Sequence, residues 1–119
     1  MTTTINQLLA QQCRHQVHGM TDAEIAAHLQ MLNNWVLAEE KIIKSFSFRN
    51  YHQTIAFVHA VADVVHAEDH HPELIVTYNR CVVKFNTHSV NSGCGGISIN
   101  DFICAAKIDN VFQQSFSGA

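Results

Sequence analysis

The chain has 119 residues, of which 47% are hydrophobic and 14% are charged, and its formal net charge at pH 7 is −3. This balance is typical of a packed domain rather than a disordered chain, and we interpret residues 1–119 as a single domain. The lysines and arginines are scattered singly, which argues against binding to nucleic-acid phosphates. The most apolar segment, 56–65, is too short to cross a membrane, and no secretion signal precedes it. We therefore expect a soluble, cytoplasmic protein.

The cysteines are widely spaced along the chain and form no C-x-x-C pair: Cys13, Cys81, Cys94 and Cys104. Such spacing favours reduced structural thiols over a zinc knuckle. Two disulfides are the less favoured alternative, because the expected compartment is reducing.

The first part of the chain predicts a helix followed by two strands. Apolar residues recur at helical spacing over 21–32, and Thr21 with Glu24 forms a capping box at the start. The short apolar run 35–37 predicts a brief strand. The alternating segment 41–48 predicts a second and clearer one.

A second helix and two further strands follow. The segment 50–68 begins with a capping pattern and carries an apolar stripe, so it predicts the clearest helix of the chain. Pro72 ends this helix and starts an extended segment. The β-rich runs 74–78 and 81–87 predict a hairpin with a two-residue turn at 79–80.

The last predicted element is a helix over 98–112, which begins with Ser98 and Asp101 as a capping pair. The resulting order is α-β-β-α-β-β-α. Short links within each strand pair predict an α+β fold, in which helices pack on one face of a four-stranded antiparallel sheet. Apolar residues on both sides of a strand, such as Val82 and Val83, predict that a second subunit covers the other face.

Three of the nine histidines stand out by placement: His70 and His71, directly before Pro72, and His88, seventeen positions after His71. Imidazoles readily supply a general acid and a general base near neutral pH, because their unperturbed pKa is about 6.5. The break at Pro72 lets adjacent histidines serve one cleft. The predicted hairpin brings the start of one strand beside the end of its partner, so we expect His71 and His88 to be neighbours.

A zinc site is the alternative interpretation of this cluster. His66 and His70 have ligand spacing on a helix, and His71 and His88 could complete the set. The pattern H-E-x-x-H is absent, however, and the helix break at His70 removes the shared face. We therefore favour acid–base chemistry. The remaining histidines are interpreted as ordinary residues: His15, His18, His28, His52, His59 and His66.

The histidine cluster belongs to a longer pattern. The segment 68–79 reads Glu-Asp-His-His-Pro-Glu-Leu-Ile-Val-Thr-Tyr-Asn, and it is followed by Thr-His at 87–88, Gly-Gly-Ile-Ser at 95–98 and Asp101. This pattern resembles the pterin-4a-carbinolamine dehydratase family, also known as a dimerization cofactor of a homeodomain transcription factor. The resemblance extends over nearly the whole chain.

The resemblance implies an enzyme that removes water from a 4a-hydroxytetrahydropterin to give a quinonoid dihydropterin in tetrahydrobiopterin recycling. It also implies a homodimer or homotetramer. The family's active-site histidines correspond to His70, His71 and His88, and Asp101 occupies the later acidic position. We expect two of the histidines to act as acid and base while the third helps to hold the pterin, and the sequence leaves open which is which.

This chemistry needs no metal or redox cofactor, since the adjacent ring nitrogen drives the loss of water and the pterin is the substrate. Asp101 has two interpretations, a helix cap or a carboxylate that orients the site. The stretch between His88 and Gly95 is longer than the family's usual Thr-His-x-x-Gly-Gly, so we expect a reshaped loop that affects substrate fit.

The resemblance also implies a second class of function, because some family members act by binding other proteins. An oligomer with an exposed helix could serve as a partner of a pterin-dependent aromatic amino acid hydroxylase or of a transcription regulator. A measurement of carbinolamine breakdown separates this alternative from the enzymatic function.

Overall fold

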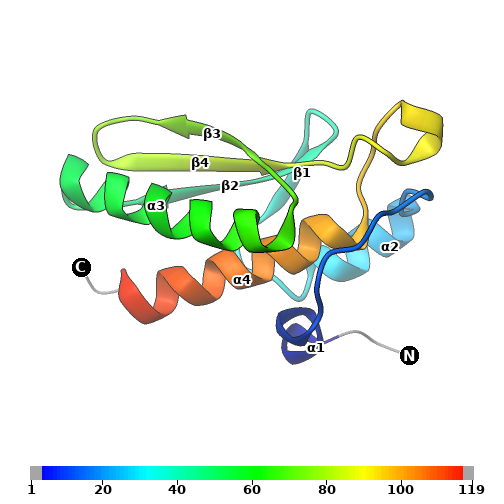
Figure 1. Ribbon diagram of the computed structural model, residues 1–119, viewed down its shortest axis with the longest axis horizontal. Helices are drawn as coiled ribbons and strands as arrows, with labels where there is room; N and C mark the ends of the chain where they lie inside the picture. Colours follow the sequence, from blue (N-terminus) through cyan, green and yellow to red (C-terminus); the bar gives the residue numbers. More distant parts are fainter. Residues whose placement is uncertain (1–3, 117–119) are drawn as a thin grey trace.

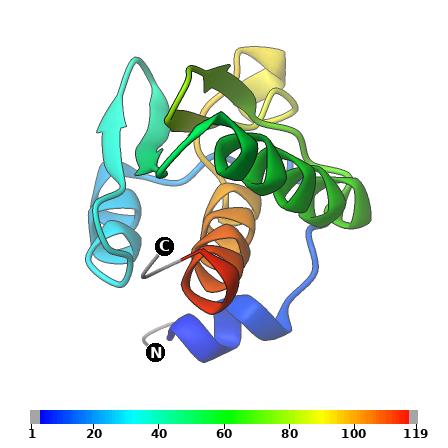
Figure 2. The same cartoon turned by 90° about the vertical axis from the view of Figure 1, so that its left-hand side faces the viewer.

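Four strands form one antiparallel sheet, in the order β1-β2-β4-β3, in the computed structural model, which describes residues 4–116 (Figure 1). The strands are β1 (Val36–Ala38), β2 (Lys41–Ser47), β3 (Glu73–Val76) and β4 (Arg80–Phe85). The helices are α1 (Ile5–Ala10), α2 (Asp22–Leu29), α3 (Tyr51–Glu68) and α4 (Ile99–Ser115), with a short 3₁₀ helix η1 (Asn91–Gly93). The helices lie on one side of the sheet (Figures 1 and 2), which confirms the predicted α+β fold.

Alternation along the strands decides which face is buried. Ile42 and Phe46 of β2 point toward the helices, as do Val83 and Phe85 of β4, and each is at most 2% exposed. They pack with apolar residues of α3 and α4, including the fully buried Phe57. Burial of these side chains is the main favourable term that holds the helices on the sheet.

Helix α1 was not predicted from the sequence. Thr4 accepts a hydrogen bond from the Gln7 backbone, and the Gln7 side chain accepts one from the Thr4 backbone, so a capping box starts the helix. Leu8 is fully buried, and α1 packs on the side of α4 that faces away from the sheet (Figures 1 and 2). The capping pattern is present in the sequence, but a helix of six residues with one buried side chain is too short for a helical periodicity to show.

The hairpin between β3 and β4 turns one residue earlier than predicted. Val76 pairs with Cys81, and the Thr77 backbone N–H donates to the Arg80 carbonyl at 2.9 Å. The two turn residues are therefore Tyr78 and Asn79, rather than residues 79–80. The pairing of Val83 with Leu74 in the core decides this register, and it outweighs the weak local turn signal.

The face of the sheet opposite the helices is apolar in its middle. Val36 pairs with Ile43, and Ile75 pairs with Val82, on strands whose alternation points these side chains outward. Val36 is 55% exposed and Ile75 is 42% exposed. Among residues 4–116, no helix is both long and apolar enough to span a membrane.

Candidate active site

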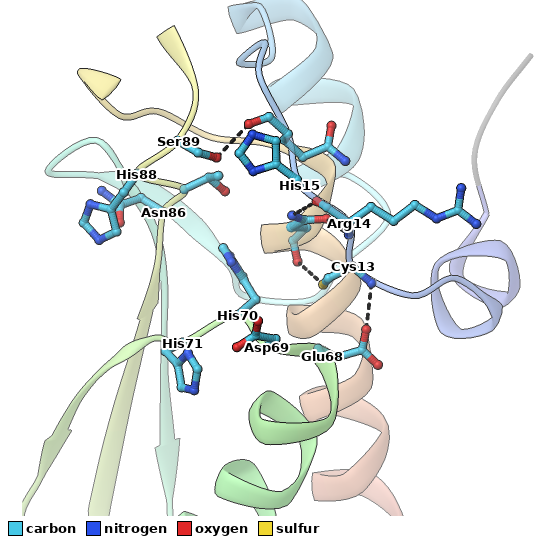
Figure 3. Close-up of a pocket in the computed structure, with 13 residues that line it drawn as sticks. Cys13, Arg14, His15, Glu68, Asp69, His70, His71, Asn86, His88 and Ser89 are labelled. Atoms are coloured by element: carbon cyan, nitrogen blue, oxygen red, sulfur yellow. Dashed lines mark hydrogen bonds between the residues drawn. The ribbon is translucent and has the colours of Figure 1, made fainter. Parts of the chain in front are cut away.

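A cleft of about 450 Å³ opens where α3 ends (Figure 3). Three chain segments and the start of α4 supply its walls: residues 68–71, residues 86–89, residues 13–16 and Asn100. The volume falls within the range of small-molecule sites. The wall residues are mostly polar, which favours a ligand with several hydrogen-bonding groups.

The end of α3 places the two adjacent histidines. Asp69 adopts a left-handed conformation (φ 52°, ψ 42°), and its backbone N–H donates to the His66 carbonyl. The His70 backbone N–H donates to the Val65 carbonyl, which closes the helix one residue later. The chain then leaves the helix axis before Pro72, so His70 and His71 lie on an irregular link, as predicted.

His70 is held by two contacts. Its Nε2 lies 2.6 Å from Oδ1 of Asp101, and its ring stacks on the ring of Phe85 at a centroid distance of 5.7 Å and an interplanar angle of 8°. The His70 side chain is 12% exposed, whereas Asp101 is fully buried. Of the three predicted histidines, His70 is therefore the one with a restricted orientation.

Asp101 joins this histidine to the start of α4. Its Oδ2 accepts hydrogen bonds from the Ser98 backbone N–H and from the Thr87 hydroxyl, both at 2.9 Å. The Ser98 hydroxyl lies 2.7 Å from that of Thr87, and its oxygen accepts from the Asn100 backbone N–H. One carboxylate oxygen therefore caps the helix, as the first interpretation predicts, while the other lies against His70.

This arrangement limits the hydrogen bonds that the His70 ring can make. A carboxylate accepts hydrogen bonds and donates none, so His70 donates from Nε2 to Asp101. In a neutral imidazole the other nitrogen, Nδ1, is then an acceptor, and it has no hydrogen-bond partner among residues 4–116.

His71 and His88 also line the cleft, and both side chains are exposed. Together with Asn86 they line a second, adjoining hollow of about 380 Å³. The prediction that the hairpin brings His71 and His88 to one place is confirmed. No hydrogen bond joins any two of the three histidines in the described part of the chain, and their imidazoles point in different directions (Figure 3).

The long loop after His88 is closed at its base. The Thr87 backbone N–H donates to the Gly96 carbonyl at 2.8 Å, and the Gly96 N–H donates back at 3.1 Å. Val90 is fully buried and anchors the loop from within. Because the extra residues lie between these closed ends, the loop lines the cleft only through its first residues, up to Ser89.

The wall formed by residues 13–16 was not anticipated. It brings His15 to the cleft, a residue that the sequence analysis treated as ordinary. The segment belongs to no helix or strand, and its side-chain hydrogen bonds are with residues 55 to 91 positions away in the chain. No spacing rule connects residues so far apart.

Glu68 lies at the junction of this segment with both long helices. Its Oε1 accepts from the Cys13 backbone N–H at 2.8 Å, and its Oε2 binds Lys107 Nζ at 2.6 Å. Burial raises the pKa of Glu68, but the hydrogen bonds from Lys107 and Cys13 outweigh it, and the net pKa lies below its ordinary value.

The placement of the side chains does not support the alternative interpretation of a zinc site. Within residues 4–116, no three His, Cys, Asp or Glu side chains are placed to hold one metal ion. His66 is exposed on α3 and does not line the cleft with His70.

Fold and cleft together define a small α+β protein with a polar, histidine-lined cleft, in which one histidine contacts a buried aspartate. Residues 18–111 match the family model described as pterin 4 alpha carbinolamine dehydratase. The chain belongs to this family.

Bacterial relatives agree with this match. One protein from Bdellovibrio bacteriovorus is 57% identical over 111 residues, covering 93% of this chain and 92% of its own length. Another from Nitrosospira multiformis is 47% identical over 116 residues, covering 95% of this chain and 99% of its own. Both carry the name "Putative pterin-4-alpha-carbinolamine dehydratase".

The fold also matches a known crystal structure, that of a transcriptional coactivator/pterin dehydratase from Brucella melitensis. The TM-score is 0.72 at 29% sequence identity, over 79% of this chain and 98% of the other. The chain therefore has the fold of this protein as well as the sequence pattern of the family.

Proposed function

We propose that this protein removes water from a 4a-hydroxytetrahydropterin to give a quinonoid dihydropterin, and so supports pterin recycling. One observation carries the proposal: His70, oriented by a buried Asp101, faces a cleft that His71 and His88 also line, in a member of a dehydratase family. The cleft is large enough for a bicyclic ring system and offers polar groups to its edges.

The reaction needs proton transfers and little else. The C4a–O bond breaks as the adjacent ring nitrogen donates its electron pair, so one group must protonate the departing hydroxyl. A second group must accept a proton from the pterin ring. No metal or redox cofactor takes part in this proposal, because the electrons come from the substrate's own ring.

The site supports a division of roles among the histidines. His70 serves as the general base, since its Nε2 donates to Asp101 and Nδ1 is left to accept a proton. His71 and His88 lie on the exposed side of the cleft, where one protonates the leaving hydroxyl and the other helps to hold the ring. Asp101 is a positioning residue.

Stopped-flow absorbance of carbinolamine breakdown, with and without the protein, tests the proposal. We expect acceleration by the wild type and a loss of about 10²–10⁴-fold in turnover for His70→Ala and for whichever of His71→Ala and His88→Ala removes the acid. His59→Ala, an exposed histidine on α3 away from the cleft, is the matched control. Wild-type rates in all three cleft variants would refute the assignment.

We also propose that the protein is a homo-oligomer that uses the outer face of the sheet. Val36 and Ile75 are exposed on this face beside the half-buried Ile43 and Val82. Light scattering after size-exclusion chromatography should give a molecular mass that is a multiple of the 13.3 kDa monomer mass. The substitution Ile75→Lys should lower the measured mass, because it places a charge on the apolar face. A monomer mass at all micromolar concentrations would contradict this.

A binding function is the second candidate, and it is favoured by the same exposed face and by the name coactivator that the Brucella melitensis protein carries. Its partner would be a pterin-dependent aromatic amino acid hydroxylase or a transcription regulator. If the wild type does not accelerate carbinolamine breakdown, the binding function becomes the leading one. Acceleration with the histidine dependence described above supports the enzyme.

A further inference from the structure

The segment 11–17, called the arm below, follows α1 on the way to α2 and lies entirely before the family match, which begins at residue 18. Residues 13–16 of the arm form one wall of the cleft. The part of the site that the family pattern does not describe is therefore supplied by this chain's own N-terminal segment.

The first half of the arm is bound to the two long helices. Asn100 of α4 pairs with the Arg14 backbone in both directions: the Arg14 N–H donates to Asn100 Oδ1 at 3.1 Å, and Asn100 Nδ2 donates to the Arg14 carbonyl at 2.6 Å. The Cys13 N–H donates to Glu68 at 2.8 Å. Asn100 is 5% exposed, so this double contact is protected from water.

The second half of the arm is bound to the long loop after His88. The Ser89 hydroxyl donates to the Gln16 carbonyl at 2.6 Å, and the Asn91 backbone N–H donates to the Val17 carbonyl at 3.2 Å. This is the loop that is longer than the usual family pattern. The loop and the arm thus hold each other beside the cleft.

His15 lies between these two sets of contacts. The hydrogen bonds of the arm on both sides of His15 hold its backbone in place. Its imidazole is exposed and has no hydrogen-bond partner among residues 4–116. In Figure 3 the Arg14 side chain extends away from the cleft, whereas the His15 ring lies over it, on a different wall from His70. A fixed backbone with an unengaged polar ring is the arrangement expected of a ligand contact.

We propose that His15 is a substrate-binding residue and that the arm determines how tightly this protein binds its pterin. The inference rests on the proposed dehydratase function. An imidazole can stack on a flat heterocycle or hydrogen-bond to its nitrogen and oxygen atoms. His15 is on a separate wall from the His70–Asp101 pair, so it contributes to binding in the ground state and the transition state alike.

Such a contact affects KM and leaves kcat unchanged. We expect His15→Ala to raise KM about 3- to 10-fold with kcat within a factor of about two of wild type. We expect the Kd of 7,8-dihydrobiopterin, a stable probe measured by fluorescence titration, to rise by the same factor. His18→Ala, an exposed histidine just beyond the arm that does not line the cleft, should change neither constant. Because His15 is exposed, both variants should melt at the wild-type temperature.

The outcomes separate this inference from the proposed function. If the wild type is active and His15→Ala leaves KM and the probe Kd unchanged, the role of His15 is refuted and the dehydratase function stands. If kcat falls while KM is unchanged, His15 takes part in the chemistry and the binding role is wrong. If the wild type binds the probe but does not accelerate carbinolamine breakdown, the dehydratase function is refuted. A higher Kd of the probe in His15→Ala would then still support a contact between His15 and the pterin. If the wild type neither binds the probe nor accelerates carbinolamine breakdown, both are overturned.

Discussion

Asp101 holds His70 and the N-terminus of α4 with the same carboxylate: Oδ1 lies 2.6 Å from His70 Nε2, and Oδ2 lies 2.9 Å from the Ser98 backbone nitrogen. The geometry of the site is therefore tied to the start of a core helix. A change at Asp101 affects the orientation of the imidazole and the stability of the helix together.

The first prediction concerns Asp101→Asn. An amide keeps one acceptor oxygen and presents an NH₂ group to one of the donors that now bind the carboxylate, so either the cap or the His70 contact is lost. We expect kcat to fall about 10- to 100-fold and stability to fall by about 1–3 kcal/mol. Stopped-flow kinetics and calorimetry measure the two effects.

Thr21→Ala is the matched control for this variant. Thr21 forms the same kind of capping box on α2, which lies away from the cleft. Its loss should cost about 1 kcal/mol of stability and leave kcat unchanged. If Asp101→Asn behaved like Thr21→Ala, with lower stability and full activity, Asp101 would be a cap without a role in positioning His70.

The second prediction concerns acid stability. The pKa of Glu68 is lowered in the folded state, so its stabilisation is fully present above the unfolded pKa, near 4.5, and is lost as pH falls through the folded value. Glu68→Gln removes the charge that binds Lys107 at 2.6 Å. We expect the variant to be less stable than wild type by about 1–2 kcal/mol at pH 7, with this difference shrinking at acid pH.

Urea denaturation at a series of pH values from 7 downward measures this difference. Glu73→Gln provides the control, because Glu73 pairs with Lys41 on the surface, where its side chain is 53% exposed and screening by water weakens the pair. Glu73→Gln should leave the unfolding midpoint unchanged. A stability difference between wild type and Glu68→Gln that is the same at every pH would contradict the prediction.

The third prediction concerns thiol reactivity. Burial raises the pKa of Cys81 to about 11, and the hydrogen bond with Cys13, together with burial, raises that of Cys104. Cys94 is exposed in the loop after His88. Because the thiolate is the reactive form, a disulfide reagent at pH 8 should label Cys94 rapidly, Cys13 more slowly, and Cys81 and Cys104 only upon unfolding.

The absorbance of the group released by such a reagent gives the number of thiols that react in each kinetic phase. Cys94→Ser should remove the fast phase and leave the slower ones unchanged. A fast phase that persists in Cys94→Ser, or one that corresponds to two thiols in the wild type, would show that a cysteine other than Cys94 is readily accessible and would contradict the prediction.

Much of the fold could be predicted because its signals are local. The alternation in 41–48 and the capping patterns at Thr21 and Ser98 involve residues a few positions apart, and the structure has a strand or a helix at each. The break at Pro72 is equally local, since the proline ring restricts its own neighbour. The hairpin then brought His71 and His88 to one cleft, because antiparallel pairing follows from a short link.

The dual role of Asp101 could not be decided from the sequence. The capping pattern with Ser98 spans three residues, whereas the contact with His70 spans 31. Whether the Asp101 carboxylate also reaches His70 depends on whether the end of α3 lies beside the start of α4. Helix packing against the sheet sets this position, and no spacing within either segment reveals it.

The sequence by itself determined the elements from α2 to α4, the two strand pairs and the three histidines that line one cleft, because propensity, capping and alternation act over short distances. The tertiary structure alone decided that His70 is the oriented imidazole and that His15 reaches the same cleft. Those facts depend on contacts such as Arg14 with Asn100, which are 86 residues apart. Contacts of that kind form only once the core has brought the helix ends together.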